Sequence, residues 1–189
     1  MPRKADVLVL LDGSTSVREL DYRKSLGFVA KFVDKLEIGA AAARVGLIQF
    51  SHIWETEFSL ADSVKMGEYA LKSKVLGLNQ LTGGTATGKV LEKAKNVLHQ
   101  DMRVYTPHVA TFILLITDGQ SHQENIIRVV VPQILAMGVK ILTVGVGPAV
   151  DAAELLLLTG GHANRVFSVD SFDKLDNEFL QTIIERMCE

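Results

Sequence analysis

Cysteine is almost absent from this chain, which excludes two common ways of stabilising a small domain. The 189 residues include one cysteine, Cys188, so no disulfide bond can form within the chain. A metal site built from several cysteine thiolates is excluded for the same reason. Any covalent partner of Cys188 must come from outside this sequence.

Charge of one sign is also in short supply. The chain carries 20 lysines and arginines against 22 aspartates and glutamates, a formal net charge of −2. A nearly neutral chain has no basic field to attract nucleic acid or an anionic membrane surface. We therefore expect no nucleic-acid partner and no membrane partner.

Long apolar runs are missing as well. The apolar segments 7–11 and 112–116 are much shorter than the roughly 20 residues that span a bilayer. Residues 1–4 lead into the first of these segments without a cleavable apolar region. We expect a soluble domain that belongs to a longer protein. An extracellular module and a cytoplasmic protein would look alike at this level, so both compartments stay open.

Apolar residues are nevertheless plentiful. They make up 48% of the chain, enough for one domain of this length to bury a substantial core without disulfides. No internal repeat or low-complexity tract divides the sequence. We therefore expect residues 1–189 to form a single domain.

Short apolar or alternating segments predict strands, and segments with apolar residues at helical spacing predict helices. The predicted strands are 7–11, 44–50, 53–58, 112–116, 139–146 and 165–169. The predicted helices are 19–36, 64–75, 86–99, 123–137, 152–158 and 172–186.

The order of these elements predicts a doubly wound α/β fold. Buried strands that alternate with helices indicate a mostly parallel sheet covered on both faces, because parallel strands need crossover connections. Segments 44–50 and 53–58 are close enough to form a hairpin, which predicts one antiparallel strand at the sheet edge. In such folds ligands bind beyond the carboxyl ends of the strands, where the strand order reverses.

Carboxylates and hydroxyls follow two of the predicted strands. Asp12, Ser14 and Ser16 alternate on the loop after the first strand, and Asp118 follows the segment 112–116. Thr85 adds a third hydroxyl from the loop before the helix 86–99. These residue types supply only oxygen ligands, with no histidine or cysteine, and oxygen ligands suit a hard divalent cation. We expect Mg²⁺, or Mn²⁺ in its place.

Only two formal negative charges belong to this predicted site. Neutral hydroxyls complete the protein's share of the ligands, so a bound cation keeps its attraction for a further carboxylate. An open coordination position of this kind favours binding of an acidic group from another molecule.

The motifs resemble those of a von Willebrand factor type A domain with a metal-ion-dependent adhesion site. They are D-G-S-T-S at 12–16, G-G-T-A-T-G at 83–88 and I-T-D-G-Q-S at 116–121, with V-G-L-I-Q-F at 45–50 and V-G-V-G at 144–147. The resemblance extends over about residues 5–187. It implies a Rossmann-like fold and metal ligands at Asp12, Ser14, Ser16, Asp118 and Thr85, with Thr82 as a weaker alternative to Thr85.

The resemblance also implies a function in adhesion without catalysis. Members of this family bind collagens, matrix proteins or receptors, and an aspartate or glutamate of the ligand completes the metal shell. Among these, the sequence most resembles the matrix-type modules of collagen VI and matrilins. The resemblance therefore implies an extracellular protein. The contact surface is expected to include Thr15, Gly84 and Gln120 around the metal. An intracellular scaffold module of the same fold is the alternative.

Other functions fit these residues less well. Alone, D-x-S-x-S is also typical of a helix N-cap, but capping does not require three converging polar loops. Segment 83–89 has phosphate-loop spacing, yet Val90 stands where a nucleotide hydrolase needs a serine or threonine to hold Mg²⁺. No G-x-S-x-G motif supports a serine hydrolase. Nucleotide hydrolysis remains the principal enzymatic alternative.

Overall fold

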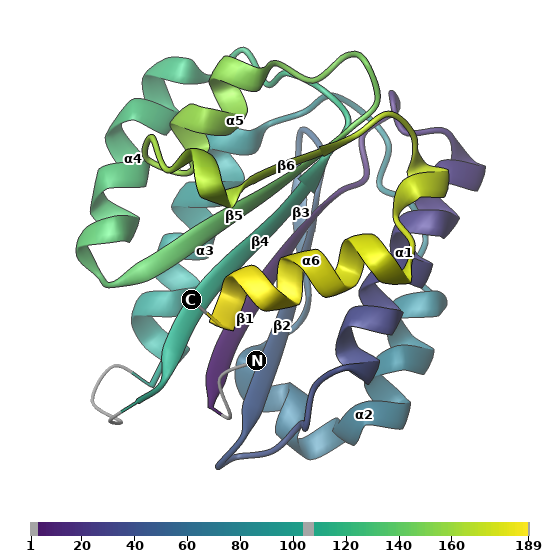
Figure 1. Cartoon of the computed structure of the whole chain (residues 1–189), viewed down its shortest axis with the longest axis vertical. Helices are drawn as coiled ribbons and strands as arrows, with labels where there is room; N and C mark the ends of the chain where they lie inside the picture. The colour runs from purple at the N-terminus through teal and green to yellow at the C-terminus, as the bar shows by residue number, and fades with distance from the viewer. Residues whose placement is uncertain (1–3, 104–107, 189) are drawn as a thin grey trace.

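The computed structural model describes residues 4–103 and 108–188. The ends of the single domain expected over residues 1–189 therefore lie outside the described residues. The strands form one sheet in the order β3-β2-β1-β4-β5-β6, and β3 is the antiparallel edge strand (Figure 1). The strands are β1 (Ala5–Asp12), β2 (Ala43–Phe50), β3 (Trp54–Phe58), β4 (Ala110–Thr117), β5 (Val139–Val146) and β6 (Val166–Val169). The predicted doubly wound fold is confirmed.

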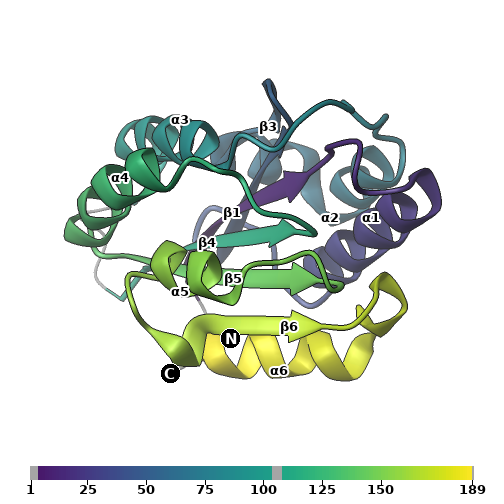
Figure 2. The same ribbon diagram turned by 90° about the horizontal axis from the view of Figure 1, so that it is seen from above.

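Helices cover both faces of the sheet, as Figure 2 shows from above. One apolar core joins the sheet to α1, α2 and α6, and a second joins it to α3, α4 and α5. The helices are α1 (Glu19–Asp34), α2 (Leu60–Leu76), α3 (Thr87–Asp101), α4 (Glu124–Ala136), α5 (Ala152–Leu158) and α6 (Asn177–Cys188), with 3₁₀ turns η1 (Ala163–Arg165) and η2 (Phe172–Lys174). Within the described ranges, no helix combines the length and apolar character that crossing a membrane requires.

The central strand β1 shows why an unbroken apolar run forms this sheet. Val7 and Val9 belong to the first core, whereas Leu8 and Leu10 belong to the second. Successive side chains of a strand point to opposite faces, so the middle of a strand that is covered on both sides is apolar at successive positions, here 7–11. All residues of β1 are buried, including its terminal Asp12.

Two helix boundaries differ by more than two residues from the sequence prediction. Helix α2 begins at Leu60, not at 64, because Ser59 and Asp62 form a capping box that starts the helix earlier. The terminal helix α6 begins at Asn177, not at 172, because the preceding residues form η2. The Asp176 carboxylate then accepts a hydrogen bond from Phe179 N, which starts α6 at that point.

The sheet topology brings the two aspartates of the predicted site to the same end of the sheet. Strands β1 and β4 are parallel neighbours with Leu11 opposite Ile116. Asp12 is the last residue of β1 and Asp118 directly follows β4, so both lie at the carboxyl ends of these strands. The chain leaves β1 toward β2 on one side, and β4 lies on the other side. This reversal of strand order is where ligands bind in doubly wound folds.

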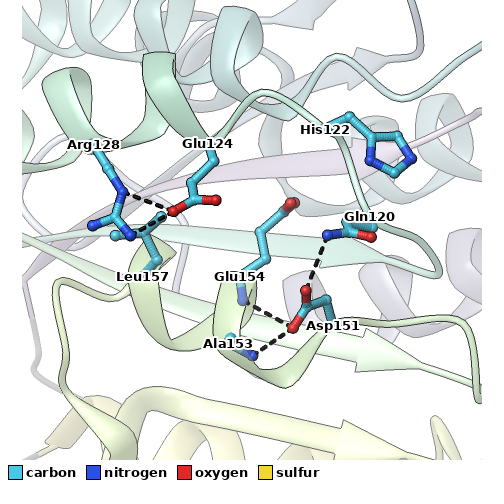
Figure 3. A pocket seen from close by; sticks show the side chains of 8 residues that line it. All are labelled: Gln120, His122, Glu124, Arg128, Asp151, Ala153, Glu154 and Leu157. Carbon is cyan, nitrogen blue, oxygen red and sulfur yellow. Dashed lines mark hydrogen bonds and ion pairs between the residues drawn. The ribbon is translucent and has the colours of Figure 1, made fainter.

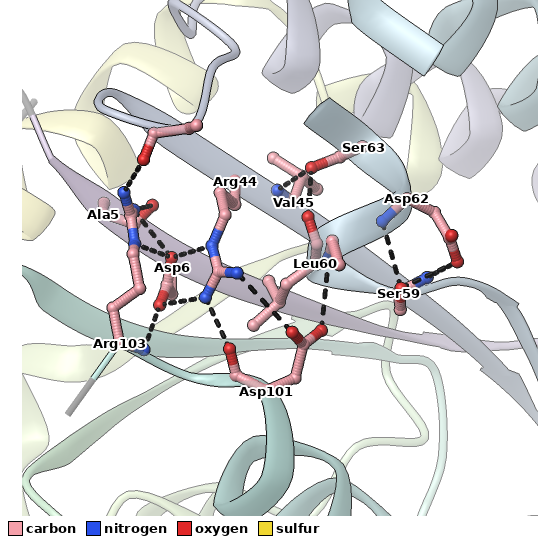
Figure 4. Close-up of polar contacts among 12 residues, drawn as sticks. Ala5, Asp6, Arg44, Val45, Ser59, Leu60, Asp62, Ser63, Asp101 and Arg103 are labelled. Atoms are coloured by element: carbon pink, nitrogen blue, oxygen red, sulfur yellow. Dashed lines mark hydrogen bonds and ion pairs between the residues drawn. The ribbon is translucent and has the colours of Figure 1, made fainter. Parts of the chain in front are cut away.

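A buried cluster of ion pairs, formed by Asp6, Arg44 and Arg103, lies at the opposite end of the sheet (Figure 4). The fully buried Asp6 accepts hydrogen bonds from Arg44 Nε and Nη2 at 2.9 and 2.8 Å. It also accepts bonds from Arg103 Nε at 2.9 Å and from Arg103 N at 2.8 Å. Burial acts to raise the pKa of Asp6, but these bonds outweigh it and hold the pKa below its ordinary value.

Replacing Asp6 by asparagine should therefore destabilise the fold. The Asp6→Asn variant removes the carboxylate that two largely buried guanidinium groups share, although Arg44 keeps its longer contact of 3.5 Å with Asp101. Breaking such a buried pair typically costs about 3 kcal/mol or more. Urea unfolding at pH 7 measures the loss. The matched control is Asp34→Asn at the exposed Lys72–Asp34 pair, which should leave the unfolding midpoint nearly unchanged. Equal midpoints for both variants would contradict the role of Asp6.

The same pair predicts an acid dependence of stability. Because the pKa of Asp6 is lower in the folded chain than in the unfolded chain, its contribution is fully present above the ordinary carboxylate pKa of about 3.9. The contribution is lost as the pH falls through the folded pKa. The stability difference between the wild type and Asp6→Asn should therefore shrink below about pH 4. A difference that stays constant down to pH 2 would contradict this assignment.

Candidate metal centre

The first loop of the candidate site begins at the carboxylate of Asp12, which is 2% exposed. Asp12 Oδ1 accepts a hydrogen bond from Ser14 N at 2.8 Å, and Oδ2 accepts one from Thr117 Oγ1 at 2.6 Å. A Cβ atom at Gly13, where the chain leaves β1, would lie 2.4 Å from Gln49 Oε1, so a larger residue there would displace the Gln49 side chain. These contacts hold the Asp12 carboxylate at the end of the sheet.

A chain of oxygen atoms connects this loop to the loop after β4. Ser14 Oγ lies 2.9 Å from Ser16 Oγ, and Ser16 Oγ donates to Asp118 Oδ1 at 2.7 Å. Ser14 is buried, whereas Ser16 is exposed. The structure thus brings together four of the five predicted ligands, and Ser16 opens the cluster to solvent.

The third loop, which carries Thr85, is hydrogen-bonded to the first loop through the backbone. Thr82 N donates to Gly13 O, and Thr15 N donates to Gly83 O, both at 2.8 Å. Thr85 is half-buried and lies two residues beyond Gly83, just before α3. The five predicted ligands therefore lie on three adjoining loops at one end of the sheet.

The electrostatic environment of the two carboxylates favours a cation. Burial raises the pKa of Asp12, the charge of Asp118 adds to this effect, and hydrogen bonds from Ser14 and Thr117 oppose it. Burial likewise raises the pKa of Asp118 against the bond from Ser16. In the part of the chain that the structure describes, no ion pair joins either carboxylate to a lysine, arginine or histidine. Two buried carboxylates without a cationic partner are costly, and a divalent cation would offset that cost.

The donor set fits a hard cation. Carboxylate and hydroxyl oxygens are the ligands of Mg²⁺ and Mn²⁺, and Mg²⁺ commonly keeps several waters beside one or two carboxylates. Among residues 4–103 and 108–188, no group of three or more histidine, cysteine, aspartate or glutamate residues is arranged to hold a metal. A metal at this site would therefore need further oxygen ligands, for which the hydroxyls of Ser14, Ser16 and Thr85 and water are the candidates.

The predicted rim residues lie at the surface around this cluster. Thr15, Gly84 and Gln120 are all exposed. Gln120 Nε2 donates to Asp151 Oδ2 at 3.0 Å, at the edge of a pocket of about 340 Å³ between α4 and α5 (Figure 3). This polar pocket lies directly beside the loop that carries Asp118.

Thr117 and Glu154 support the site, and sequence reasoning did not identify either of them. Thr117 holds the Asp12 carboxylate, and its place directly before Asp118 was an available signal. Glu154 accepts from Ser121 N through both carboxylate oxygens, at 3.1 and 3.3 Å, and so holds the loop after Asp118. No local pattern predicts a contact across 33 residues.

The phosphate-loop alternative lacks its structural context. Helix α2 precedes the segment 83–89, whereas a phosphate loop follows a buried strand. Val90 is fully buried in the core against α4, so this position packs rather than binding a metal.

Comparison with known proteins identifies the family. The model of the von Willebrand factor type A domain matches residues 6–184. The chain is 32% identical to the mouse (Mus musculus) collagen alpha-6(VI) chain over 98% of its own length and 8% of that protein. It is 32% identical to bovine (Bos taurus) vitrin over 97% of its length and 27% of vitrin, and 27% identical to human (Homo sapiens) matrilin-1 over 98% and 38%. The chain thus spans only a small part of these relatives.

Solved structures agree with this family, and one of them is described with an occupied metal site. Proximal thread matrix protein 1 from the mussel byssus superimposes with a TM-score of 0.85 at 25% identity, over 98% of this chain and 48% of that one. A second structure of that protein, with the same TM-score of 0.85, is described with a zinc-occupied MIDAS motif. Since the family model matches nearly the whole described chain, the protein belongs to the von Willebrand factor type A domain family.

Proposed function

We propose that this chain is a protein-binding module that holds one divalent cation through Asp12, Ser14, Ser16, Thr85 and Asp118. The observation that carries the proposal is the hydrogen-bonded run from Asp12 through Ser14 and Ser16 to Asp118. Among residues 4–103 and 108–188, neither of its two buried carboxylates forms an ion pair with a lysine, arginine or histidine. Mg²⁺ is the expected ion, with Mn²⁺ as the alternative. When bound, the ion supplies a position that attracts a carboxylate of the partner.

Each part of the site has a separate role in this proposal. Asp12 and Asp118 provide the negative charge that attracts the cation, Asp118 directly or through water. The serine and threonine hydroxyls complete the shell without adding charge, which preserves the attraction for an incoming acidic side chain. The exposed Thr15, Gly84 and Gln120 contact the partner around the metal.

The relatives support an adhesive function in the extracellular matrix. Collagen VI chains, vitrin and matrilins are matrix proteins, and this chain resembles one segment of each. We place the chain in the same compartment, as a single module of a longer protein, with a matrix protein, collagen or receptor as partner. No catalytic turnover is expected. An intracellular scaffold of the same fold has no support among these relatives.

Replacing Asp12 should abolish metal binding without unfolding the protein. The wild type should gain stability with Mg²⁺, by about 2.7 kcal/mol at a concentration one hundred times the dissociation constant. The Asp12→Asn variant should gain nothing, and its metal-free form should be at least as stable as the wild type because it removes a buried charge. Urea unfolding with and without Mg²⁺ measures both effects. Asp34→Asn, on the exposed face of α1, is the control and should respond like the wild type.

Acid should weaken metal binding earlier than for ordinary carboxylates. Protons compete with the cation for Asp12 and Asp118, and the pKa of each is raised. Mg²⁺ affinity should therefore be full above the raised pKa values and fall through them, at a pH above the ordinary carboxylate value of about 3.9. Calorimetric titrations from pH 7.5 downward test this. Affinity that stays constant to pH 4 would argue against these ligands.

Partner binding should require both the metal and an acidic group. Immobilised collagen and matrix extract serve as probes, with the protein applied in Mg²⁺ or in EDTA. Retention should be lost in EDTA, in the Ser14→Ala variant, and when the carboxylates of the probe are amidated. Retention that is equal in EDTA and Mg²⁺ would point to a metal-independent surface.

A further inference from the structure

The loop that carries Thr85 has little regular structure of its own, yet a buried glutamine orders it. Gln49, at the end of β2, is 1% exposed. Its Oε1 accepts from Leu81 N at 2.7 Å, and its Nε2 donates to Asn79 O at 3.0 Å. One side chain therefore binds the backbone on both sides of residue 80, which fixes the direction of the Gln80 side chain.

Gln80 extends from this loop to the first loop of the metal centre. Its Nε2 donates to Ser14 O at 2.9 Å and to Val17 O at 2.7 Å. These carbonyls lie at the two ends of the turn that contains Ser16, and Val17 N also donates to Ser14 O at 3.2 Å. The amide of Gln80 thus closes the turn that presents both serine hydroxyls.

Backbone bonds connect the same two loops on the other side of the turn. Besides the bonds from Thr82 N and Thr15 N, Gly83 N donates to Thr15 Oγ1 at 2.7 Å. The bonds of Thr15 and Gly83 lie near the solvent, whereas the half-buried Gln80 lies beneath the turn. Gln80 therefore connects the two loops through its side chain, which binds the carbonyls of Ser14 and Val17 on the less exposed side of the turn.

A serine hydroxyl has short reach, so the backbone decides where its oxygen lies. Mg²⁺ requires oxygens at about 2.0–2.1 Å, whereas Ca²⁺ accepts about 2.3–2.6 Å in a more flexible shell. Loosening the turn between Ser14 and Val17 would increase the spread of the two hydroxyl positions. This spread should lower the affinity for Mg²⁺ more than the affinity for Ca²⁺, because Mg²⁺ is smaller and requires more regular geometry.

We infer that Gln80 is a positioning residue that holds Ser14 and Ser16 at the spacing required for Mg²⁺ and so favours Mg²⁺ over Ca²⁺. This inference rests on the proposed metal-binding function. It adds a residue outside the ligand set and assigns to it the choice of ion.

The test compares Mg²⁺ and Ca²⁺ affinities of three variants by calorimetric titration of the metal alone. Gln80→Met keeps the length of the side chain and removes both donated bonds, and Gln80→Asn keeps the amide but is too short to reach both carbonyls. The control, Gln181→Met, removes the exposed amide of Gln181 on α6, which donates to Glu185 Oε1 at 3.0 Å. Urea unfolding of the metal-free proteins checks that each variant is folded. If Gln80→Met does not fold, the affinities of Gln80→Asn alone test the inference.

Both Gln80 variants should lose about tenfold in Mg²⁺ affinity, the lower end of what supporting residues of metal sites contribute, and less than about threefold in Ca²⁺ affinity. Gln181→Met should match the wild type. Equal losses for the two ions, or no loss, would overturn the role of Gln80. Absence of Mg²⁺ binding in the wild type would instead contradict the proposed metal site itself, so the two failures are distinguishable.

Discussion

The buried negative charge at the carboxyl ends of β1 and β4 is the constraint from which the site follows. Asp12 and Asp118 end two neighbouring parallel strands of an apolar sheet, where burial and mutual repulsion raise the pKa of Asp12. The hydroxyls around them donate hydrogen bonds but carry no charge. An arrangement of this kind is costly unless a cation shares it, and this cost is the physical basis of the metal site that we propose at the three polar loops.

The two ends of the sheet handle buried charge in different ways. At the amino end of β1, Asp6 is neutralised by Arg44 and Arg103, which lowers its pKa and leaves nothing for a ligand to supply. At the carboxyl end, Asp12 has only neutral donors in the described structure. One strand therefore carries a carboxylate with built-in partners at its start and a carboxylate suited to an external cation at its end.

Much of this organisation was predictable from sequence. Continuous apolar runs specify strands covered on both faces, and the polar motifs after two such runs predict the end of the sheet where they meet. The start of α6 could not be predicted in this way, because the apolar spacing continues through η2 and only the cap at Asp176 separates the two. Contacts between distant segments, such as Glu154 with Ser121 and Gln80 with Ser14, depend on how loops fold against each other and leave no periodic signal.

The central claim is that a single divalent cation lies among the oxygens of the three loops. A crystal structure of the protein with Mn²⁺, measured at the manganese absorption edge, tests it most directly. The account predicts one strong anomalous peak within coordination distance of Asp12, Ser14 and Ser16, and its loss in crystals of Asp12→Asn. A well-ordered Asp12 carboxylate with no peak beside it, at Mn²⁺ concentrations far above those of other sites, would contradict the account.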